Sequence, residues 1–278
     1  MAMLNRKVAI VTGAGRGVGR ATAALLAEHG ARIVLNDLDE AVCHEAAREI
    51  ADQGAEQGSE VLAVPGSVTD PELPDQLVAR AVEAFGGIDI VVNNAGYIWN
   101  GALHNQSDEQ LQAMLDVHVA APLRILRAFG RWLRPVAKAE SERDGRARCR
   151  KVVNVSSVSG TQGAATQVGY SAGKAAIVGV TKSLAKEWGR YNVTVNAVSL
   201  GYIATRLTQG FRDTPPTIEV AGRAHRVGIA DPAREAVRQA TALGRLGEPE
   251  DAAGGIFLLC LPQSDYVTGE VLTVSGGL

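Results

Sequence analysis

Short apolar runs alternate with helical patterns along the whole chain, and this alternation constrains the fold more than any other feature. Runs that predict buried strands lie at residues 7–12, 31–36, 60–65, 88–92, 151–155, 193–198 and 271–274. Helical patterns separate most of them, ending near 29, 53, 85, 136, 190 and 261. Strands that alternate with helices need right-handed crossovers, which give a mostly parallel sheet covered on both faces. The sequence therefore predicts an α/β fold, and the lack of an internal repeat or linker favours one domain over 1–278.

Two helix starts carry capping signals. Asp70 followed by Pro71 predicts an N-cap with proline at the first helical position. Ser107 and Gln110 have the spacing of a capping box. We therefore expect a helix from about 71 to 85 and a long helix from about 107 to 136.

Two segments break the alternation. Residues 138–151 hold nine charged side chains in fourteen positions, which predicts a solvated loop. Residues 202–242 hold six arginines, four acids and the pair Pro215-Pro216. A long excursion of this kind in a compact domain is typical of a substrate lid. The alternative is a plain pair of surface helices.

Composition excludes several classes of protein. The chain has 46% hydrophobic residues and 28 cationic against 30 acidic side chains, which is typical of a globular protein and gives no reason to expect nucleic acid as partner. No apolar run approaches the 18 residues that suggest a membrane span, and the first residues lack a signal-peptide pattern. Cys43, Cys149 and Cys260 have neither disulfide nor metal spacing, so we expect no metal site and a reducing compartment, the cytoplasm.

A glycine-rich turn connects the first strand to the first helix. Residues 12–19 read TGAGRGVG. Glycines let the backbone approach a pyrophosphate, and the free N–H groups at a helix start attract its charge. The candidate contacts in this turn are Gly13, Arg16, Gly17, Val18 and Gly19. A plain strand–helix turn is the alternative interpretation.

Asp37 follows the second strand, 18 residues after Gly19. An acid near this position hydrogen-bonds the adenosine ribose of a dinucleotide. A carboxylate there repels a 2′-phosphate, so Asp37 favours NAD over NADP. Arg16 favours NADP, because a cation beside the ribose would pair with that phosphate. In the alternative interpretation Asp37, like Asp39, only caps the next helix.

The fourth strand ends in Asn93-Asn94-Ala95-Gly96. In open parallel sheets, ligands bind in the crevice at the carboxyl edge. We therefore predict that Asn94, Ala95 and Gly96 contact the cofactor. A strand-terminating turn is the alternative.

Tyr170 and Lys174 are four residues apart on a predicted helix, so they share one face. Ser157 lies thirteen residues earlier, just after the fifth strand, at the same carboxyl edge. A nearby ammonium stabilises a phenolate, so we expect Lys174 to lower the pKa of Tyr170. A serine hydroxyl can hold a substrate oxygen while the phenol exchanges its proton, and a dinucleotide supplies the hydride. The alternative is a buried tyrosine and a surface lysine without chemistry.

Taken together, these motifs resemble the short-chain dehydrogenase/reductase family, in its single-domain, 3-oxoacyl reductase-like branch. The resemblance spans nearly the whole chain and rests on TGAGRGVG at 12–19, NNAG at 93–96, Ser157, YSAGK at 170–174, NAV at 196–198, GRLGEPED at 244–251 and YVTGEVLTVSGG at 266–277. It implies a doubly wound Rossmann fold of about seven parallel strands. It also implies Tyr170 as acid/base, Lys174 on the nicotinamide ribose, Ser157 on the substrate oxygen, and Ile203 and Thr205 over the nicotinamide.

The chain departs from the family pattern at four places. His118 replaces the usual asparagine of a proton relay, and it either serves through its backbone carbonyl or titrates near neutral pH and adds its own proton step. Ser67-Val68 replaces Asp-Val beside the adenine, where Val68 is the expected contact. Leu200-Gly201 replaces Pro-Gly, and Gly201 remains a candidate contact. Ser275 replaces an aspartate near the C-terminus.

The resemblance implies an NAD(P)-dependent oxidoreductase that interconverts a secondary alcohol and a ketone, with a 3-oxoacyl thioester as the first substrate candidate. A hydroxysteroid or another alcohol is the alternative substrate, and a non-enzymatic dinucleotide sensor is the alternative class. We expect Trp99, Leu103, Ile203, Leu207 and Phe211 in the substrate pocket. The lid arginines either meet phosphates of an acidic carrier or lie on a solvated surface. Small residues on the helix of Tyr170 and Lys174 suggest close helix packing in a homotetramer.

Overall fold

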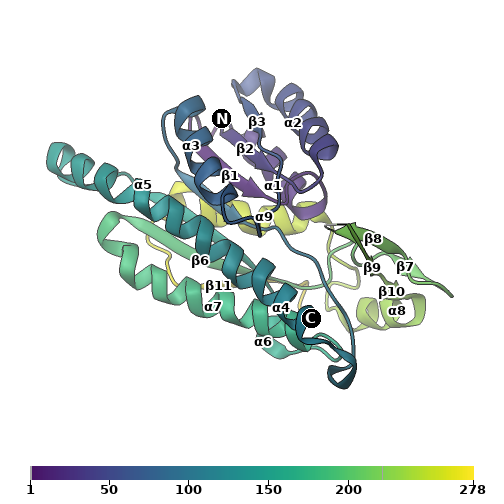
Figure 1. The fold of residues 1–278 in the computed structure, drawn as a ribbon. Helices are drawn as coiled ribbons and strands as arrows, with labels where there is room; N and C mark the ends of the chain where they lie inside the picture. The colour runs from purple at the N-terminus through teal and green to yellow at the C-terminus, as the bar shows by residue number, and fades with distance from the viewer. Residues whose placement is uncertain (1, 221) are drawn as a thin grey trace.

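The computed structural model describes residues 2–220 and 222–278, and a parallel sheet forms its centre (Figure 1). Within these residues the sheet has seven strands in the order β11-β6-β5-β4-β1-β2-β3. The strands are β1 (Val8–Thr12), β2 (Arg32–Asn36), β3 (Val61–Ala63), β4 (Ile90–Asn93), β5 (Arg150–Ser157), β6 (Val193–Leu200) and β11 (Val271–Val274). All neighbouring pairs are parallel. This confirms the predicted doubly wound, Rossmann-type fold.

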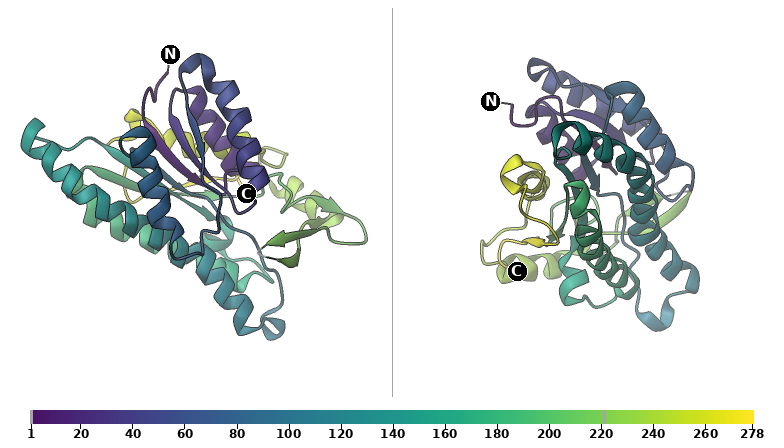
Figure 2. Two further views of the ribbon diagram at one scale, coloured as in Figure 1. Left: turned by 45° about the horizontal axis from the view of Figure 1, so that its top comes forward. Right: turned by 90° about the vertical axis from the view of Figure 1, so that its left-hand side faces the viewer.

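Helices cover both faces of the sheet (Figure 2). The first face carries α1 (Gly17–Glu28), α2 (Glu40–Gly54) and α9 (Pro249–Cys260), and the second carries α3 (Leu73–Phe85), α5 (Ala121–Asp144) and α7 (Val168–Trp188). Successive strand residues alternate between the two hydrophobic clusters: Ala9 and Val11 belong to the first, Val8 and Ile10 to the second. Because both faces are buried, the strands read as continuous apolar runs in the sequence.

Shorter helical segments join these elements. They are η1 (Ala55–Gln57), η2 (Leu103–Asn105), α4 (Asp108–Leu115), α6 (Val158–Gln162), η4 (Gly189–Tyr191) and η5 (Pro262–Ser264).

The strand order reverses between β1 and β4, and this switch point determines where a ligand can bind. Strands β2 and β3 lie on one side of β1, and β4, β5, β6 and β11 lie on the other. The connections that leave β1 and β4 therefore diverge and open a crevice at the carboxyl edge.

Of the two predicted helix starts, one is confirmed and the other is wrong. The capping box is confirmed, since Ser107 Oγ accepts from Gln110 N and Gln110 Oε1 accepts from Ser107 N. The predicted start of α3 is wrong: Asp70 accepts a hydrogen bond from Glu72 N in a turn, and the helix begins at Leu73. The long predicted helix is also interrupted, because the π-helical turn η3 (Asp116–Ala120) separates α4 from α5.

The prediction of a solvated loop over 138–151 is only partly right: residues 145–149 form the loop and most charged side chains of the segment are exposed, but the rest is helix or strand and three charges are buried. Helix α5 continues to Asp144, and Glu140, Arg150 and Lys151 are buried. The two carboxylate oxygens of Glu140 accept from Arg150 Nη1 and Nη2 at 2.9 and 2.8 Å. Lys151 pairs with Asp265 at 2.7 Å. Burial is tolerated because each buried charge has a charged partner.

Residues 202–242 form a small structure beyond the carboxyl edge of the sheet (Figure 1). Strand β7 (Gly210–Phe211) pairs with β10 (Ile229–Ala230), β8 (Thr217–Val220) pairs antiparallel with β9 (Arg223–Arg226), and α8 (Asp231–Ala240) follows. The alternative of two surface helices is therefore wrong. We refer to residues 202–242 as the lid segment; the single-domain assignment and the lid function stay predictions.

The hairpin of β8 and β9 is anchored to the loop after β4. The ring of His225 lies 4.9 Å from that of Tyr97 and 4.4 Å from that of Trp99, between ring centroids. Arg223 forms an ion pair with Glu109 on α4. These contacts hold the hairpin beside the crevice.

Across the described ranges, no helix combines the length and apolarity needed to cross a bilayer. Cys43, Cys149 and Cys260 are free thiols. Over the same residues, no cluster of three or more His, Cys, Asp or Glu is placed to hold a metal ion.

Candidate active site

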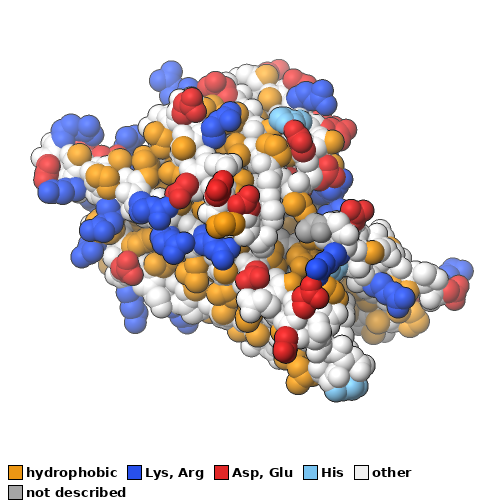
Figure 3. All heavy atoms as spheres, in the orientation of Figure 1, with side chains coloured by type: hydrophobic (Ala, Val, Ile, Leu, Met, Phe, Trp, Pro, Cys, Tyr) orange, Lys and Arg blue, Asp and Glu red, His pale blue; other side chains and the backbone are white. Residues whose placement is uncertain are grey.

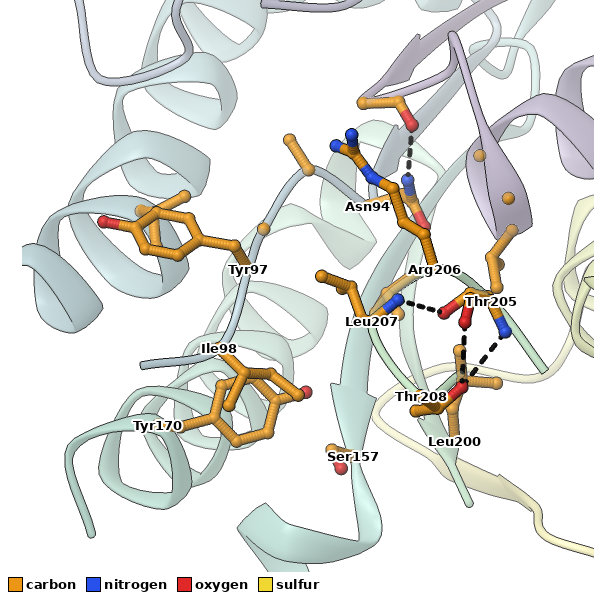
Figure 4. A pocket seen from close by; sticks show the side chains of 18 of the residues that line it. Asn94, Tyr97, Ile98, Ser157, Tyr170, Leu200, Thr205, Arg206, Leu207 and Thr208 are labelled. Carbon is orange, nitrogen blue, oxygen red and sulfur yellow. Dashed lines mark hydrogen bonds between the residues drawn. The ribbon is translucent and has the colours of Figure 1, made fainter. Parts of the chain in front are cut away.

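One cavity of about 960 Å³ runs along the carboxyl edge of the sheet and beneath the lid segment (Figure 4). The structure brings every predicted site residue to its wall. These are Gly13, Arg16, Gly17, Val18, Gly19, Asp37, Val68, Asn94, Ala95, Gly96, His118, Ser157, Tyr170, Lys174, Gly201, Ile203 and Thr205. Leu207 also lines it, whereas Trp99, Leu103 and Phe211 do not contribute to the wall as described. Trp99 packs against His225 instead, so its predicted place in the pocket is wrong.

Two glycines of the turn after β1 are required by close backbone approach. A Cβ on Gly19 would lie 2.2 Å from the carbonyl oxygen of Gly13, so a larger residue would force the turn apart. Gly13 has φ +61°, and a Cβ there would lie 2.7 Å from Cα of Ala95. Helix α1 starts at Gly17 with no acid in its first turn and no side-chain cap among the described residues. Its first N–H groups therefore face the cavity as a cradle for an anion.

Asn94 and Thr12 lock the ends of β1 and β4 together. Asn94 Nδ2 donates to the carbonyls of Thr12 and Gly13 at 2.9 and 3.1 Å. Thr12 Oγ1 accepts from the N–H groups of Asn94 and Ala95, both at 3.1 Å. The side-chain amide of Asn94 thus holds the glycine turn in shape while the residue lines the cavity.

Asp37 ties the end of β2 to the glycine turn. Its Oδ2 accepts from Gly15 N at 2.9 Å, and its Oδ1 accepts from Asp39 N at 3.2 Å. Asp39, not Asp37, caps α2, by accepting from Val42 N. The helix-capping interpretation of Asp37 is therefore wrong, and its carboxylate lies in the cavity wall. Arg16, the cation that favoured NADP, pairs with Asp39 at 3.1 Å.

Ser157, Tyr170 and Lys174 meet where β5 ends against α7. The strand terminates at Ser157, and the phenol oxygen of Tyr170 points toward that end (Figure 4). Lys174 lies one turn further along α7, with Nζ 5.8 Å from the centre of the Tyr170 ring. Its Nζ donates to the carbonyl of Val155 at 2.7 Å, which fixes the ammonium beneath the phenol.

Burial dominates the electrostatics of this group. It raises the pKa of Tyr170 to about 12, and a hydrogen bond with Ser157 only partly offsets this effect. It also lowers the pKa of Lys174 to about 8. The structure thus contradicts the predicted lowering of the Tyr170 pKa, because loss of hydration destabilises both charged forms. At neutral pH the phenol is protonated and can act as an acid.

His118 lies in the π-helical turn and is buried against the site. Its Nε2 is 2.8 Å from the carbonyl oxygen of Tyr97, and its ring meets the Tyr170 ring edge-on at 5.0 Å. A carbonyl can only accept, so Nε2 carries the proton and donates. Burial and the Lys174 ammonium hold the pKa of His118 well below 6.5. The expectation that His118 titrates near neutral pH is therefore wrong, and the backbone-carbonyl alternative stays a prediction.

The sequence did not predict the individual roles of two residues of the lid segment. His225 anchors the hairpin through Tyr97 and Trp99, but a lone histidine in an arginine-rich segment predicts nothing specific. Arg206 is the member of the lid arginines that lines the main cavity as described. Nothing in its spacing distinguishes it from the other five.

The cavity fits a dinucleotide on its own geometry. It has an anion cradle at α1, a carboxylate at the end of β2 and an acid–base group at the end of β5 along one wall. The arrangement can place a proton donor beside a carbonyl while a bound nicotinamide supplies the hydride.

Known proteins are similar to this chain in sequence and in fold. The model of a family described as enoyl-(acyl carrier protein) reductase matches residues 13–278. The 3-oxoacyl-[acyl-carrier-protein] reductase FabG of Vibrio cholerae is 35% identical over 99% of this chain and 98% of its own length. The short-chain reductase protein NovJ of Streptomyces niveus is 36% identical over 100% of this chain and 95% of its own length. A solved variant of a Serratia marcescens short-chain dehydrogenase/reductase superposes with a TM-score of 0.79 at 27% identity, over 99% of this chain and 98% of that one.

Proposed function

This chain belongs to the short-chain dehydrogenase/reductase family, and on that premise we propose that it reduces the ketone of a 3-oxoacyl thioester with NADH as the preferred reductant. Its reaction class is that of the family, NAD(P)-dependent interconversion of an alcohol and a carbonyl compound. The observation that carries the proposal is the position of Ser157, Tyr170 and Lys174 on the same cavity wall as the glycine cradle.

Each residue of the group has one task in this mechanism. The Ser157 hydroxyl donates to the substrate carbonyl oxygen and holds it beside the phenol. Tyr170 gives its proton to that oxygen, and a bound NAD(P)H would supply the hydride for the carbonyl carbon. Lys174 stabilises the phenolate that remains, from its fixed place on the Val155 carbonyl. By resemblance to the family, its ammonium also binds the nicotinamide ribose.

The substrate class rests on the names of the relatives and on the character of the wall. Ile98, Leu207 and Ile218 line the same cavity as Tyr170, which suits an acyl chain. Initial rates with an acetoacetyl thioester and with a hydroxysteroid panel test this directly, each with NADH and NADPH. Faster turnover of the thioester supports the proposal. Faster turnover of a steroid would identify the alternative substrate, and binding of cofactor without any turnover would favour a sensor.

Asp37→Ala is expected to relax the discrimination against NADP(H). The carboxylate that would repel a 2′-phosphate is removed, so the ratio of kcat/KM for NADH over NADPH should fall about tenfold or more, as for a like-charge contact of 1.4 kcal/mol. Steady-state kinetics with both cofactors measure the ratio. Tighter binding of NADPH than NADH by the wild-type protein would refute the proposed preference.

His118→Asn is expected to leave the pH profile of kcat/KM unchanged between about pH 6 and 8. The imidazole is neutral throughout that range because its pKa lies well below 6.5. The asparagine amide reaches only as far as Nδ1, so the hydrogen bond to the Tyr97 carbonyl is lost and activity should be retained only in part. A wild-type profile with an inflection near pH 6.5 that this variant removes would contradict our account of His118.

We also propose a homotetramer in the cytoplasm. Helix α7 exposes Ala172, Ala175 and Gly179, and Leu123 of α5 and Val168 of α7 are exposed as well. Figure 3 shows hydrophobic side chains between basic ones on the side that carries α5 and α7. Light scattering tests the assembly, and a monomer mass at micromolar concentrations would contradict it.

A further inference from the structure

We propose that Arg206 of the lid segment is the counter-ion of the cofactor's pyrophosphate, so that the bound cofactor holds this segment over the glycine cradle. The inference rests on the proposed function insofar as the cavity must hold a dinucleotide. It adds a binding residue on the side of the cavity opposite to α1.

Three of the six lid arginines have ion-pair partners, whereas Arg206, Arg226 and Arg234 have none among the described residues; of these three, Arg206 alone lines the main cavity as described. Arg212 pairs with Asp231, Arg223 with Glu109, and Arg238 with Glu235. Arg206 lines the cavity and forms neither an ion pair nor a side-chain hydrogen bond with any residue that the structure describes. A guanidinium with five donors facing a ligand cavity without a carboxylate partner points to an anionic ligand.

The backbone places Arg206 over the cradle. A Cβ on Gly17, the first residue of α1, would lie 3.5 Å from the methyl group of Thr205. The segment that carries Arg206 thus crosses directly above the helix start. An anion held by the N–H groups of α1 would lie between the helix and this segment, within reach of a long guanidinium side chain.

The surrounding charges are consistent with an anion at this place. Partial burial and the nearby Arg16 lower the pKa of Arg206, while Asp37 and Asp39 act in the opposite direction. Asp37 accepts from Gly15 N, and Asp39 from Arg16 and Val42 N, so both carboxylates have partners of their own. A phosphate group between Arg16 and Arg206 would offset the repulsion between the two cations.

The pyrophosphate fits better than the other phosphates in reach. Thr205 lies over Gly17 of the cradle, and the charge of Arg206 also interacts with Asp37, so the guanidinium lies between the cradle and the ribose end. The Asp37 carboxylate disfavours a 2′-phosphate beside it. The pyrophosphate is common to NADH and NADPH, so the two cofactors should depend on Arg206 equally.

The test measures binding without turnover. We expect Arg206→Gln to weaken NADH, NADPH and ADP-ribose by a similar factor of about ten or more, measured by calorimetry, because a charge-assisted hydrogen bond is lost. Arg206→Lys keeps the charge without the bidentate fork, so its affinities should lie between those of the wild-type protein and those of Arg206→Gln. Arg212→Gln is the matched control, since Arg212 is an exposed lid arginine paired with Asp231, and its affinities should match wild type within about twofold.

Hydrogen exchange tests whether cofactor binding is coupled to the lid segment. NADH should slow hydrogen exchange over residues 205–230 in the wild-type protein and in Arg212→Gln, and much less in Arg206→Gln. The thermal midpoints of the variants establish that each remains folded.

Three results would overturn the inference. Loss of NADPH affinity alone would assign Arg206 to the 2′-phosphate. Unchanged binding of all three ligands, with poorer kcat/KM for a coenzyme A thioester but not for a thioester without phosphates, would assign it to the substrate. Unchanged affinities and kinetics would leave Arg206 without a ligand role. A wild-type protein that bound neither NADH nor NADPH would instead refute the proposed function.

Discussion

Replacing Tyr170 with phenylalanine is expected to lower kcat for ketone reduction by about 10²–10⁴-fold, the usual contribution of a general acid. The substitution removes only the hydroxyl that gives the proton, and the ring keeps its packing against His118. Because the glycine cradle and Asp37 are untouched, the Kd for NADH should change by less than about threefold, within the range of lost surface contacts. Stopped-flow reduction of the ketone and calorimetric titration of NADH measure the two effects separately.

The matched control is Tyr266→Phe, which removes the same hydroxyl from a fully exposed tyrosine. It should keep wild-type kinetics and stability. If Tyr170→Phe retained more than about a tenth of wild-type kcat, a different group would have to supply the proton.

Glu140→Ala is expected to destabilise the protein by about 3–5 kcal/mol, because it leaves a buried arginine without its partner. Only 5% of the Glu140 side chain and 3% of the Arg150 side chain are exposed, and the carboxylate accepts from both Nη1 and Nη2 of Arg150. Urea unfolding measures the free-energy change. Glu142→Ala is the control, since Glu142 is an exposed member of an i,i+4 pair with Lys138 and should cost less than about 1 kcal/mol.

The stabilisation by Glu140 should also depend on pH. Hydrogen bonds from Arg150 lower the pKa of Glu140 to about 2, below its ordinary value of 4.5. A carboxyl whose pKa is lowered on folding binds a proton more readily when unfolded, so its stabilisation is complete above 4.5 and is lost as the pH falls through 2. The stability difference between wild type and Glu140→Ala should therefore shrink between pH 5 and 2. A difference that stayed constant over that range would contradict the ion-pair account.

The parts of the fold that rest on local patterns could be predicted from the sequence. Strands buried on both faces have to be apolar throughout, so an apolar run such as VAIVT of β1 predicts a buried strand directly. The capping box at Ser107 and Gln110 is local as well. The nucleotide end was predictable because close backbone approach at Gly13 and Gly19 leaves room for glycine alone.

The errors concern residues whose environment comes from distant parts of the chain. The charged run 138–151 looked solvated, but Arg150, which pairs with Glu140, also donates from Nε to the carbonyl of Ile88, 62 positions away. Trp99 looked like a pocket residue, but His225, more than a hundred positions away, covers it. The pKa values of Tyr170 and His118 depend on burial, which spacing does not reveal.

A crystal structure of the protein with NADH and an unreactive 3-oxoacyl thioester analogue would test the central claim most directly. We expect the analogue's ketone oxygen within hydrogen-bonding distance of both the Tyr170 phenol and the Ser157 hydroxyl, with its carbon facing the hydride-bearing carbon of the nicotinamide. A nicotinamide ring bound away from Tyr170, or a phenol turned from it with no space for the ketone between them, would contradict the account.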